Sequence, residues 1–188
     1  LELKRMHEKL GITFIYVTHD QEEALTMSGK IVVMSDGIVQ QVDTPKNLYD
    51  NPCNLFVAGF MGSPQMNFID AQVSQSGSDV LLVFGSHSIK VPEAKAKALI
   101  DGNYINKTVV VGIRPEDFHD QEIVINSIIR LYEMLGAEVF LYFDIDQFSC
   151  TARVNPRTTA RPGDTIKMAI DTSKLHLFDK DTQLVIAN

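Results

Sequence analysis

The sequence predicts an α/β segment followed by a domain built almost entirely of β-strands. Residues 13–17 form a β-branched and aromatic run without polar alternation, which is typical of a strand buried on both faces of a parallel sheet. From about residue 66 the sequence changes to short apolar runs separated by turn residues, as in a compact barrel or sandwich. We therefore predict two parts, residues 1–62 and residues 63–188, with the boundary near residues 62–66.

The first part opens on a helical pattern. Leu3, Met6 and Leu10 share one helix face, Gly11 follows them, and no capping residue precedes them. We therefore expect the chain to begin inside a helix and to be a fragment of a longer protein.

The rest of the first part carries local signals for helices and one hairpin. Asp20 and Glu23 have the spacing of a capping box, Asp36-Gly37 is a strong hairpin turn, and Thr44-Pro45 is an N-cap followed by proline at the first helical position. The predicted elements are helices at 22–27, 46–49 and 54–61, with hairpin strands at 31–34 and 38–42.

In the second part, turn signals separate most of the predicted strands, and one helix interrupts them. Pro92 precedes that helix and Asp101-Gly102 ends it. The predicted helix spans 93–100, and the strands span 68–73, 80–83, 88–91, 108–114, 122–133, 138–144, 149–154, 165–170 and 174–178.

Composition excludes several classes of protein. Of the 188 residues, 45% are hydrophobic and 22% are charged, as in globular domains. The 17 basic and 24 acidic side chains give a net charge of -7, which is the wrong sign for a protein that binds nucleic acid. The isolated cysteines Cys53 and Cys150 fit a reducing compartment, and no apolar run reaches the length of a membrane-spanning helix. We expect a cytoplasmic protein without nucleic acid as a partner.

His19 is the most informative candidate site residue. It follows the predicted buried strand and precedes a helix N-terminus, a position where α/β sheets bind ligands and where phosphate is favoured. His19 is thus a candidate phosphate contact; a ring satisfied by backbone groups at the strand end is an equally good interpretation. The other histidines (His7, His87, His119 and His176) have no metal-ligand spacing, so we predict no metal site.

Motifs in both parts resemble one family. Residues 17–27 read Val-Thr-His-Asp-Gln-Glu-Glu-Ala-Leu-Thr-Met, and residues 56–64 read Phe-Val-Ala-Gly-Phe-Met-Gly-Ser-Pro. With Val-Gly-Ile-Arg-Pro-Glu-Asp at 111–117 and Leu-His-Leu-Phe-Asp at 175–179, the chain resembles the ATPase subunits of bacterial ABC importers for sugars. The nearest group is the MalK-like, glycerol-3-phosphate and multiple-sugar subfamily, and the resemblance covers nearly the whole chain.

The resemblance implies both a fold and a function. Residues 1–62 would be the C-terminal part of a RecA-like ABC nucleotide-binding domain, and residues 63–188 an OB-like, TOBE-type regulatory domain. His19 takes the place of the switch histidine that contacts the γ-phosphate of ATP. The intact subunit would use ATP and Mg²⁺, form a homodimer, and work with transmembrane permease subunits and a sugar-binding protein at the inner face of the membrane. A regulatory protein is a further candidate partner.

The other ATPase motifs are missing from this chain. Gly29-Lys30 lacks the spacing of a phosphate-binding loop, and Asp36, although it follows an apolar strand, lies in a hairpin turn. We therefore expect these residues alone to be inactive and to hold no nucleotide tightly. The sequence leaves two further functions open: a stand-alone regulatory module that binds a small ligand or a signalling protein, and a dimerisation piece.

Arg114, Pro115 and Glu116 lie at the end of a predicted strand. A rigid turn with a local ion pair is the preferred interpretation, and a ligand site is the alternative.

Overall fold

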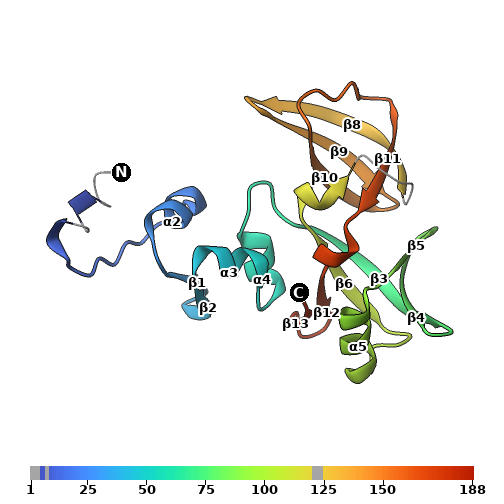
Figure 1. Cartoon of the computed structure of the whole chain (residues 1–188), viewed down its shortest axis with the longest axis horizontal. Helices are drawn as coiled ribbons and strands as arrows, with labels where there is room; N and C mark the ends of the chain where they lie inside the picture. Colours follow the sequence, from blue (N-terminus) through green and yellow to red (C-terminus); the bar gives the residue numbers. More distant parts are fainter. Residues whose placement is uncertain (1–4, 7–8, 120–124) are drawn as a thin grey trace.

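The computed structural model describes residues 5–6, 9–119 and 125–188 of the chain. Figure 1 shows the N-terminal segment and helix α2 (Gln21–Met27) extending away from two β-sheets, with short helices between them. The described residues of the predicted opening helix, at 5–6 and 9–10, are helical, and its other residues lie outside the described part. Gly11 then takes a φ of 63°, a left-handed conformation that ends a helix readily.

The local signals of the first part produce the elements they predict. Asp20 caps α2 by accepting a hydrogen bond from the Glu23 N–H, at 3.0 Å. Asp36 and Gly37 both have positive φ and join β1 (Ile31–Ser35) to β2 (Ile38–Asp43) as an antiparallel hairpin. Side chains also cap the next two helices: Thr44 caps α3 (Pro45–Asp50), and Asn54 caps α4 (Leu55–Phe60).

The buried strand predicted at residues 13–17 is wrong. These residues have no regular secondary structure, and Ile15 and Val17 are 91% and 90% exposed. A strand that is apolar on both faces needs neighbouring strands and covering helices, because a lone strand leaves its peptide groups and its side chains in water. The described part of the chain places no strand beside this run.

Two antiparallel sheets form the second part. One has six strands in the order β13-β12-β6-β3-β4-β5, and the other has five in the order β10-β9-β8-β11-β7. In chain order the strands are β3 (Asn67–Ser76), β4 (Asp79–Phe84), β5 (His87–Lys90), β6 (Thr108–Ile113), β7 (Phe118–His119), β8 (Ile125–Leu135), β9 (Glu138–Ile145), β10 (Phe148–Val154), β11 (Thr165–Ile170), β12 (His176–Asp179) and β13 (Val185–Ala187). The predicted all-β domain is confirmed.

In the second part, the structure differs from the predicted elements mainly at short strands. β7 and β13 were not predicted because two or three residues give no periodicity. The strand predicted at 174–178 is divided between the 3₁₀ turn η2 (Thr172–Lys174) and β12. The first residues of the strand predicted at 122–133 lie outside the described part. Helix α5 (Glu93–Asp101) is present as predicted, and η1 (Pro115–Asp117) follows β6.

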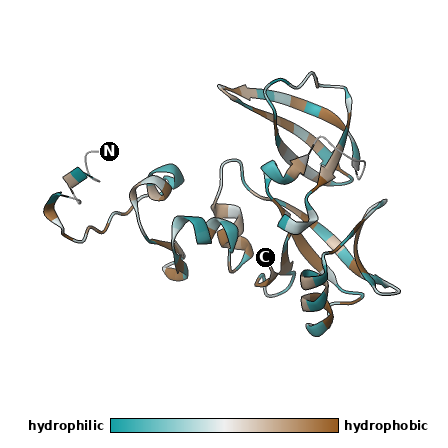
Figure 2. Cartoon of the chain, in the orientation of Figure 1, coloured by the Kyte–Doolittle hydropathy of each residue, from teal (hydrophilic) through white to brown (hydrophobic). Residues whose placement is uncertain are grey.

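The two sheets share one apolar core. Alternate residues of β3 and β4, such as Val73 and Leu82, are fully buried and belong to the same cluster as Phe143 and Ala152 from the other sheet. Figure 2 shows the resulting alternation of apolar and polar residues along these strands. Period-two burial of this kind fixes which face of each strand is turned inward.

Helix α4 belongs to two apolar clusters at once. Val57 and Met61 pack with Val33 and Leu48 of the first part, whereas Ala58 packs with residues of the six-stranded sheet, including Phe178. The helix therefore joins the hairpin region to the sheet. The domain boundary at residues 62–66 remains a prediction.

Candidate functional site

The segment that carries His19 is fixed by hydrogen bonds among its own residues. Tyr16 Oη and Thr18 Oγ1 both donate to Glu23 Oε2, each at 3.0 Å, and the Asp20 N–H donates to Thr18 Oγ1 at 3.0 Å. The bond to Glu23 raises the pKa of Tyr16. Since residues on both sides of His19 are engaged, the backbone around this histidine has a defined turn.

His19 itself is exposed and lies in a bend just before α2. Within the described part of the chain its ring has no hydrogen-bond partner, and the strand whose end would supply backbone partners is absent. The structure therefore leaves the ring available for a ligand, and it does not by itself identify one.

The residues around His19 fit one contact to a nucleotide and no more. The imidazole supplies a hydrogen-bond donor of the kind that a phosphate oxygen accepts. Its neighbours Asp20, Glu22 and Glu23 are carboxylates, which repel a triphosphate unless a metal ion or further cations neutralise it. A nucleotide would need its phosphate cradle from residues outside this chain.

Lys30 and Asp36, which resemble parts of ATPase motifs in the sequence, lie on either side of strand β1. Lys30 follows Gly29 directly before β1, with no glycine-rich loop around it. Asp36 lies in the hairpin turn with a φ of 51°, and its carboxylate accepts a bond from Ser35 Oγ at 3.2 Å. Asp36 is therefore part of the hairpin turn, as predicted, and Gly29-Lys30 is not part of a phosphate-binding loop.

Arg114 makes long-range contacts that the sequence did not reveal. It is only 2% exposed, and its guanidinium donates to the carbonyl oxygens of Met61 and Tyr49, the latter at 2.5 Å. Its Cζ lies 3.7 Å from the centre of the Tyr49 ring, a cation–π distance. The turn predicted at Pro115 is confirmed as η1.

The predicted local ion pair of Arg114 is wrong. Glu116 accepts a hydrogen bond from Tyr49 Oη instead, and no ion pair between Arg114 and Glu116 occurs among the described residues. The Tyr49 carbonyl in the last turn of α3 and the Met61 carbonyl directly after α4 bind the guanidinium instead, because carbonyls at helix ends have no donor within their own helix. The predicted pairing failed because the partners of Arg114 are more than 50 residues away in sequence.

A polar cavity of about 350 Å³ lies beside this cluster, between α3, η1, η2 and β12. Its lining carries mixed charge, with Asp50 and Lys174 among the residues. Asp50 pairs with Lys46 of its own helix, and Glu116 is engaged by Tyr49. The cavity therefore indicates no particular class of ligand.

His176 also lines this cavity and is held as a neutral ring. It is buried, with Nδ1 2.8 Å from Asn188 Oδ1. Burial lowers the pKa of His176 from 6.5 to about 4, with the bond to Asn188 opposing that effect and nearby Arg114 and Lys95 adding to it. The ring stays uncharged at neutral pH.

Stability should therefore fall on mild acidification. The unfolded chain binds the His176 proton below about pH 6.5, whereas the folded chain binds it only near pH 4, so the contribution is complete above pH 6.5 and is lost as the pH falls. We expect a loss of about 3 kcal/mol between pH 7 and pH 4 from this residue. Urea unfolding of wild type and His176→Gln at both pH values tests this, with a smaller drop expected for the variant. Equal drops in the two proteins would contradict it.

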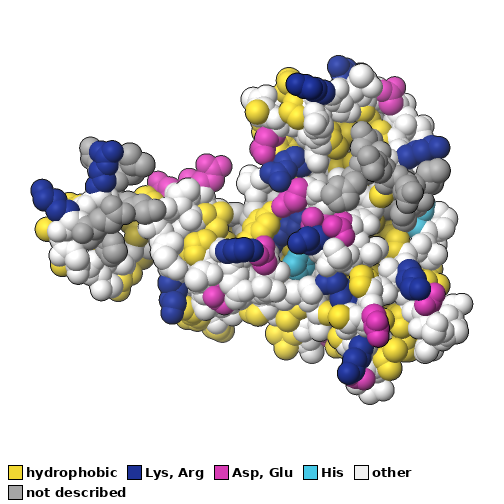
Figure 3. Space-filling view, viewed as in Figure 1, with side chains coloured by type: hydrophobic (Ala, Val, Ile, Leu, Met, Phe, Trp, Pro, Cys, Tyr) yellow, Lys and Arg dark blue, Asp and Glu magenta, His cyan; other side chains and the backbone are white. Residues whose placement is uncertain are grey.

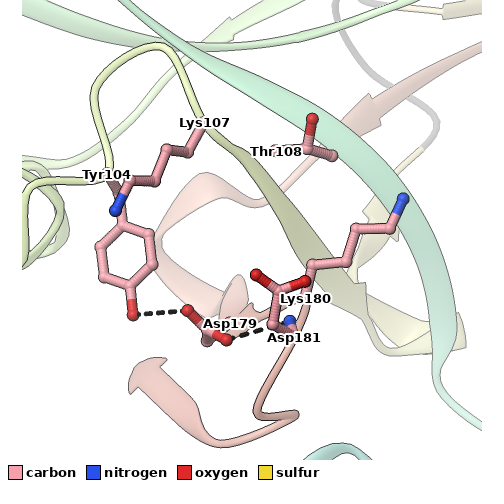
Figure 4. A pocket seen from close by; sticks show the side chains of 6 residues that line it. All are labelled: Tyr104, Lys107, Thr108, Asp179, Lys180 and Asp181. Carbon is pink, nitrogen blue, oxygen red and sulfur yellow. Dashed lines mark hydrogen bonds between the residues drawn. The ribbon is translucent and has the colours of Figure 1, made fainter.

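Other polar clusters in the described residues serve the fold. A hollow of about 310 Å³ has Asp179 in its lining, and this carboxylate accepts hydrogen bonds from Tyr104 Oη, at 2.9 Å, and from backbone groups of its own turn. Figure 4 shows the side chains that line the hollow. Figure 3 shows acidic and basic side chains interspersed on the visible face. Cys150 is buried, and burial raises its pKa to about 12.

Metal-binding clusters and membrane-spanning helices are both absent from the described residues. In residues 5–6, 9–119 and 125–188, no group of three or more His, Cys, Asp or Glu residues is arranged to hold a metal ion. None of the described helices has the length and apolar character needed to cross a bilayer.

Comparisons with known proteins match both parts of the chain. The MalK OB fold domain family matches residues 62–118. The oligosaccharide import ATP-binding protein MsmX of Bacillus subtilis is 45% identical over 98% of this chain and 52% of its own length. The trehalose/maltose import ATP-binding protein MalK of Thermococcus litoralis is 37% identical over 96% of this chain and 50% of its own length.

One further relative matches the chain to the same extent. The GgtA protein of Synechocystis, an ATP-binding protein for uptake of osmoprotective compounds, is 40% identical over 98% of this chain and 52% of its own length. Among solved structures, the molybdate-binding protein ModG aligns with 59% of this chain at 14% identity and a TM-score of 0.48. The chain spans about half the length of the curated relatives it matches. Over nearly its whole length the chain is similar to ATP-binding subunits of sugar-import ABC transporters, and residues 62–118 match the MalK OB fold domain family.

Proposed function

We propose that this chain is the C-terminal portion of the ATP-hydrolysing subunit of an ABC importer for carbohydrates. The observation that carries the proposal is the extent of the similarity to MsmX, which covers 98% of the chain and so includes the His19 segment as well as the OB fold. A stand-alone regulatory module would need only the second part. The match therefore favours the ATPase subunit over that alternative.

In this function His19 acts on the terminal phosphate. ATP with Mg²⁺ supplies the phosphoryl group that is transferred to water. The exposed His19 imidazole would donate a hydrogen bond to the γ-phosphate and help to orient the attacking water. The turn set by Thr18, Asp20 and Glu23 would hold the ring at the edge of the nucleotide site.

The proposed assembly follows from the same relationship. Two subunits would enclose the nucleotides between them as a homodimer, and permease subunits and a sugar-binding protein would complete the importer at the inner face of the membrane. MsmX, MalK and GgtA are named for different transported compounds although each is at least 37% identical to this chain. Within the carbohydrate class, similarity over these residues therefore selects no single sugar.

A chimeric subunit tests the proposal. The half of Bacillus subtilis MsmX that aligns with this chain is replaced by the 188 residues, and ATP hydrolysis and oligosaccharide uptake are measured. We expect both activities. Two controls, the remaining half of MsmX alone and this chain alone, should show no turnover. A chimera that folds and binds ATP but neither hydrolyses it nor supports uptake would contradict the proposal.

A further inference from the structure

One peptide group connects the His19 segment to the six-stranded sheet. The Gly62 N–H donates a hydrogen bond to Gln21 Oε1 at 2.9 Å, and Gln21 is the first residue of α2, two positions after His19. The Met61 carbonyl, which belongs to the same peptide group as the Gly62 N–H, accepts a hydrogen bond from Arg114 Nη1. The Met61–Gly62 peptide is therefore held from both sides.

The Arg114 side of this link is rigid. Arg114 is buried, its second nitrogen donates to the Tyr49 carbonyl at 2.5 Å, and its guanidinium lies over the Tyr49 ring. Tyr49 Oη in turn donates to Glu116 of η1, directly after β6. These contacts fix the guanidinium relative to both α3 and the sheet.

Gly62 is suited to this position by its missing side chain. Its φ is 130°, a conformation that favours glycine. A Cβ atom there would lie 3.0 Å from Arg114 Nη1 and 3.4 Å from the Tyr49 ring, so a larger residue would crowd the guanidinium. The backbone thus approaches Arg114 closely only because residue 62 is glycine.

Hydrogen bonds on the two sides of one peptide strengthen each other. Donation to the carbonyl polarises the peptide group and makes its N–H a better donor. The bond from Arg114 carries a positive charge, and charge-assisted bonds are the stronger kind. Loss of the Arg114 bond is therefore expected to weaken the bond between Gly62 and Gln21.

We propose that Gln21 and Arg114 are positioning residues that couple the orientation of the OB domain to that of the His19 segment through the Met61–Gly62 peptide. The functional meaning of this coupling rests on the proposed role of His19. A shift of the OB domain would move the peptide, and with it the start of α2 and the neighbouring imidazole. The link is thus a route by which a regulatory domain sets the position of a phosphate contact.

Hydrogen exchange of the 188-residue chain tests the coupling without nucleotide. Arg114→Met removes the donor, and we expect exchange of the backbone amides of residues 24–28 to become about fivefold faster. Gln21→Met removes the acceptor and should accelerate the same amides. In the double variant the two effects should not add, since both substitutions break one link. Full additivity, or unchanged exchange in α2 when Arg114 is replaced, would overturn the proposal.

Conservative variants separate positioning from general destabilisation. Gln21→Glu keeps an acceptor oxygen and should restore slow exchange, whereas Gln21→Met should not. If Arg114→Met does not fold, Arg114→Lys, which keeps the charge but loses the paired donors, replaces it. If Gln21→Glu accelerates amide exchange in α2 as much as Gln21→Met does, the proposal is also overturned.

A matched arginine serves as the control. Arg161 also lies over a tyrosine ring, 5.0 Å from the centre of Tyr132, and donates to a backbone carbonyl at 2.7 Å. Arg161→Met should leave exchange in α2 unchanged. No step of the exchange experiment uses ATP, so its result is independent of ATP turnover by His19 variants. If the exchange data show coupling but His19→Ala has normal turnover, only the proposed function is contradicted. If His19→Ala loses turnover but the exchange data show no coupling, only the link is contradicted.

Discussion

Replacing His19 by alanine in the MsmX chimera is expected to lower ATP turnover about 100-fold, the usual effect of losing one donor to transition-state charge. Phosphoryl transfer depends on positioning and on stabilising charge at the phosphate oxygens, so one well-placed imidazole has a large effect. His19 is exposed, and its ring has no hydrogen-bond partner in the described residues, so the substitution should leave folding intact. Steady-state phosphate release measures the result.

A second histidine provides the control for this prediction. His87 lies on β5 in the OB domain, where its ring packs against Phe84. His87→Ala should leave turnover near normal. Turnover by the His19→Ala chimera within a few-fold of the unsubstituted chimera would remove His19 from the mechanism.

Replacing Phe178 by alanine should produce the largest loss of stability, about 3–5 kcal/mol in the free energy of unfolding. Phe178 is fully buried in the cluster that joins α4 to the six-stranded sheet, and its ring meets the Phe68 ring edge to face at 6.2 Å. Removing it leaves a cavity between helix and sheet. Urea unfolding of the 188-residue chain measures the loss.

Phe60 on α4 is the matched control. It also belongs to an aromatic pair, with Phe56 at 5.8 Å, but 38% of its surface is exposed. Because more than a third of its surface stays in water on folding, Phe60→Ala should cost less, about 1–2 kcal/mol. A loss below 1 kcal/mol for Phe178→Ala, or equal losses for the two variants, would show that α4 is not anchored through this cluster.

Elements set by neighbouring residues could be predicted from the sequence. The Asp36-Gly37 turn, the Asp20, Thr44 and Asn54 caps and the helix after Pro92 all depend on groups within a few residues of one another. Alternation along the longer strands likewise indicates which face is buried, so a barrel or sandwich could be predicted from it, although the order of strands in each sheet could not. These features need no knowledge of the rest of the fold.

Features that depend on distant partners could not be predicted in this way. The apolar run at 13–17 has the composition of a buried strand, but composition does not supply the neighbouring strands that burial requires. Arg114 has an acidic residue two positions away, yet its actual acceptors are carbonyls at the ends of two helices, more than 50 residues distant in sequence. Local charge therefore suggested the wrong partner.

The candidate site also has a part that local sequence predicts and a part that depends on distant residues. His19 was found because its motif lies within one short segment that resembles a known family. The bond between Gln21 and Gly62 joins residues 41 positions apart, and the bond between Met61 and Arg114 joins residues 53 positions apart. Of these residues, only Gly62 carried a local signal, because Gly62-Ser63-Pro64 ends the helical pattern before it.

The most direct test of the central claim is the affinity of the chimera for ATP and for ADP, with and without His19→Ala, measured with EDTA present so that ATP is not consumed. If His19 contacts the terminal phosphate, the substitution should raise the Kd for ATP about tenfold and leave the Kd for ADP unchanged, since ADP lacks that group. An equal change for both nucleotides, or no change for either, would contradict the account.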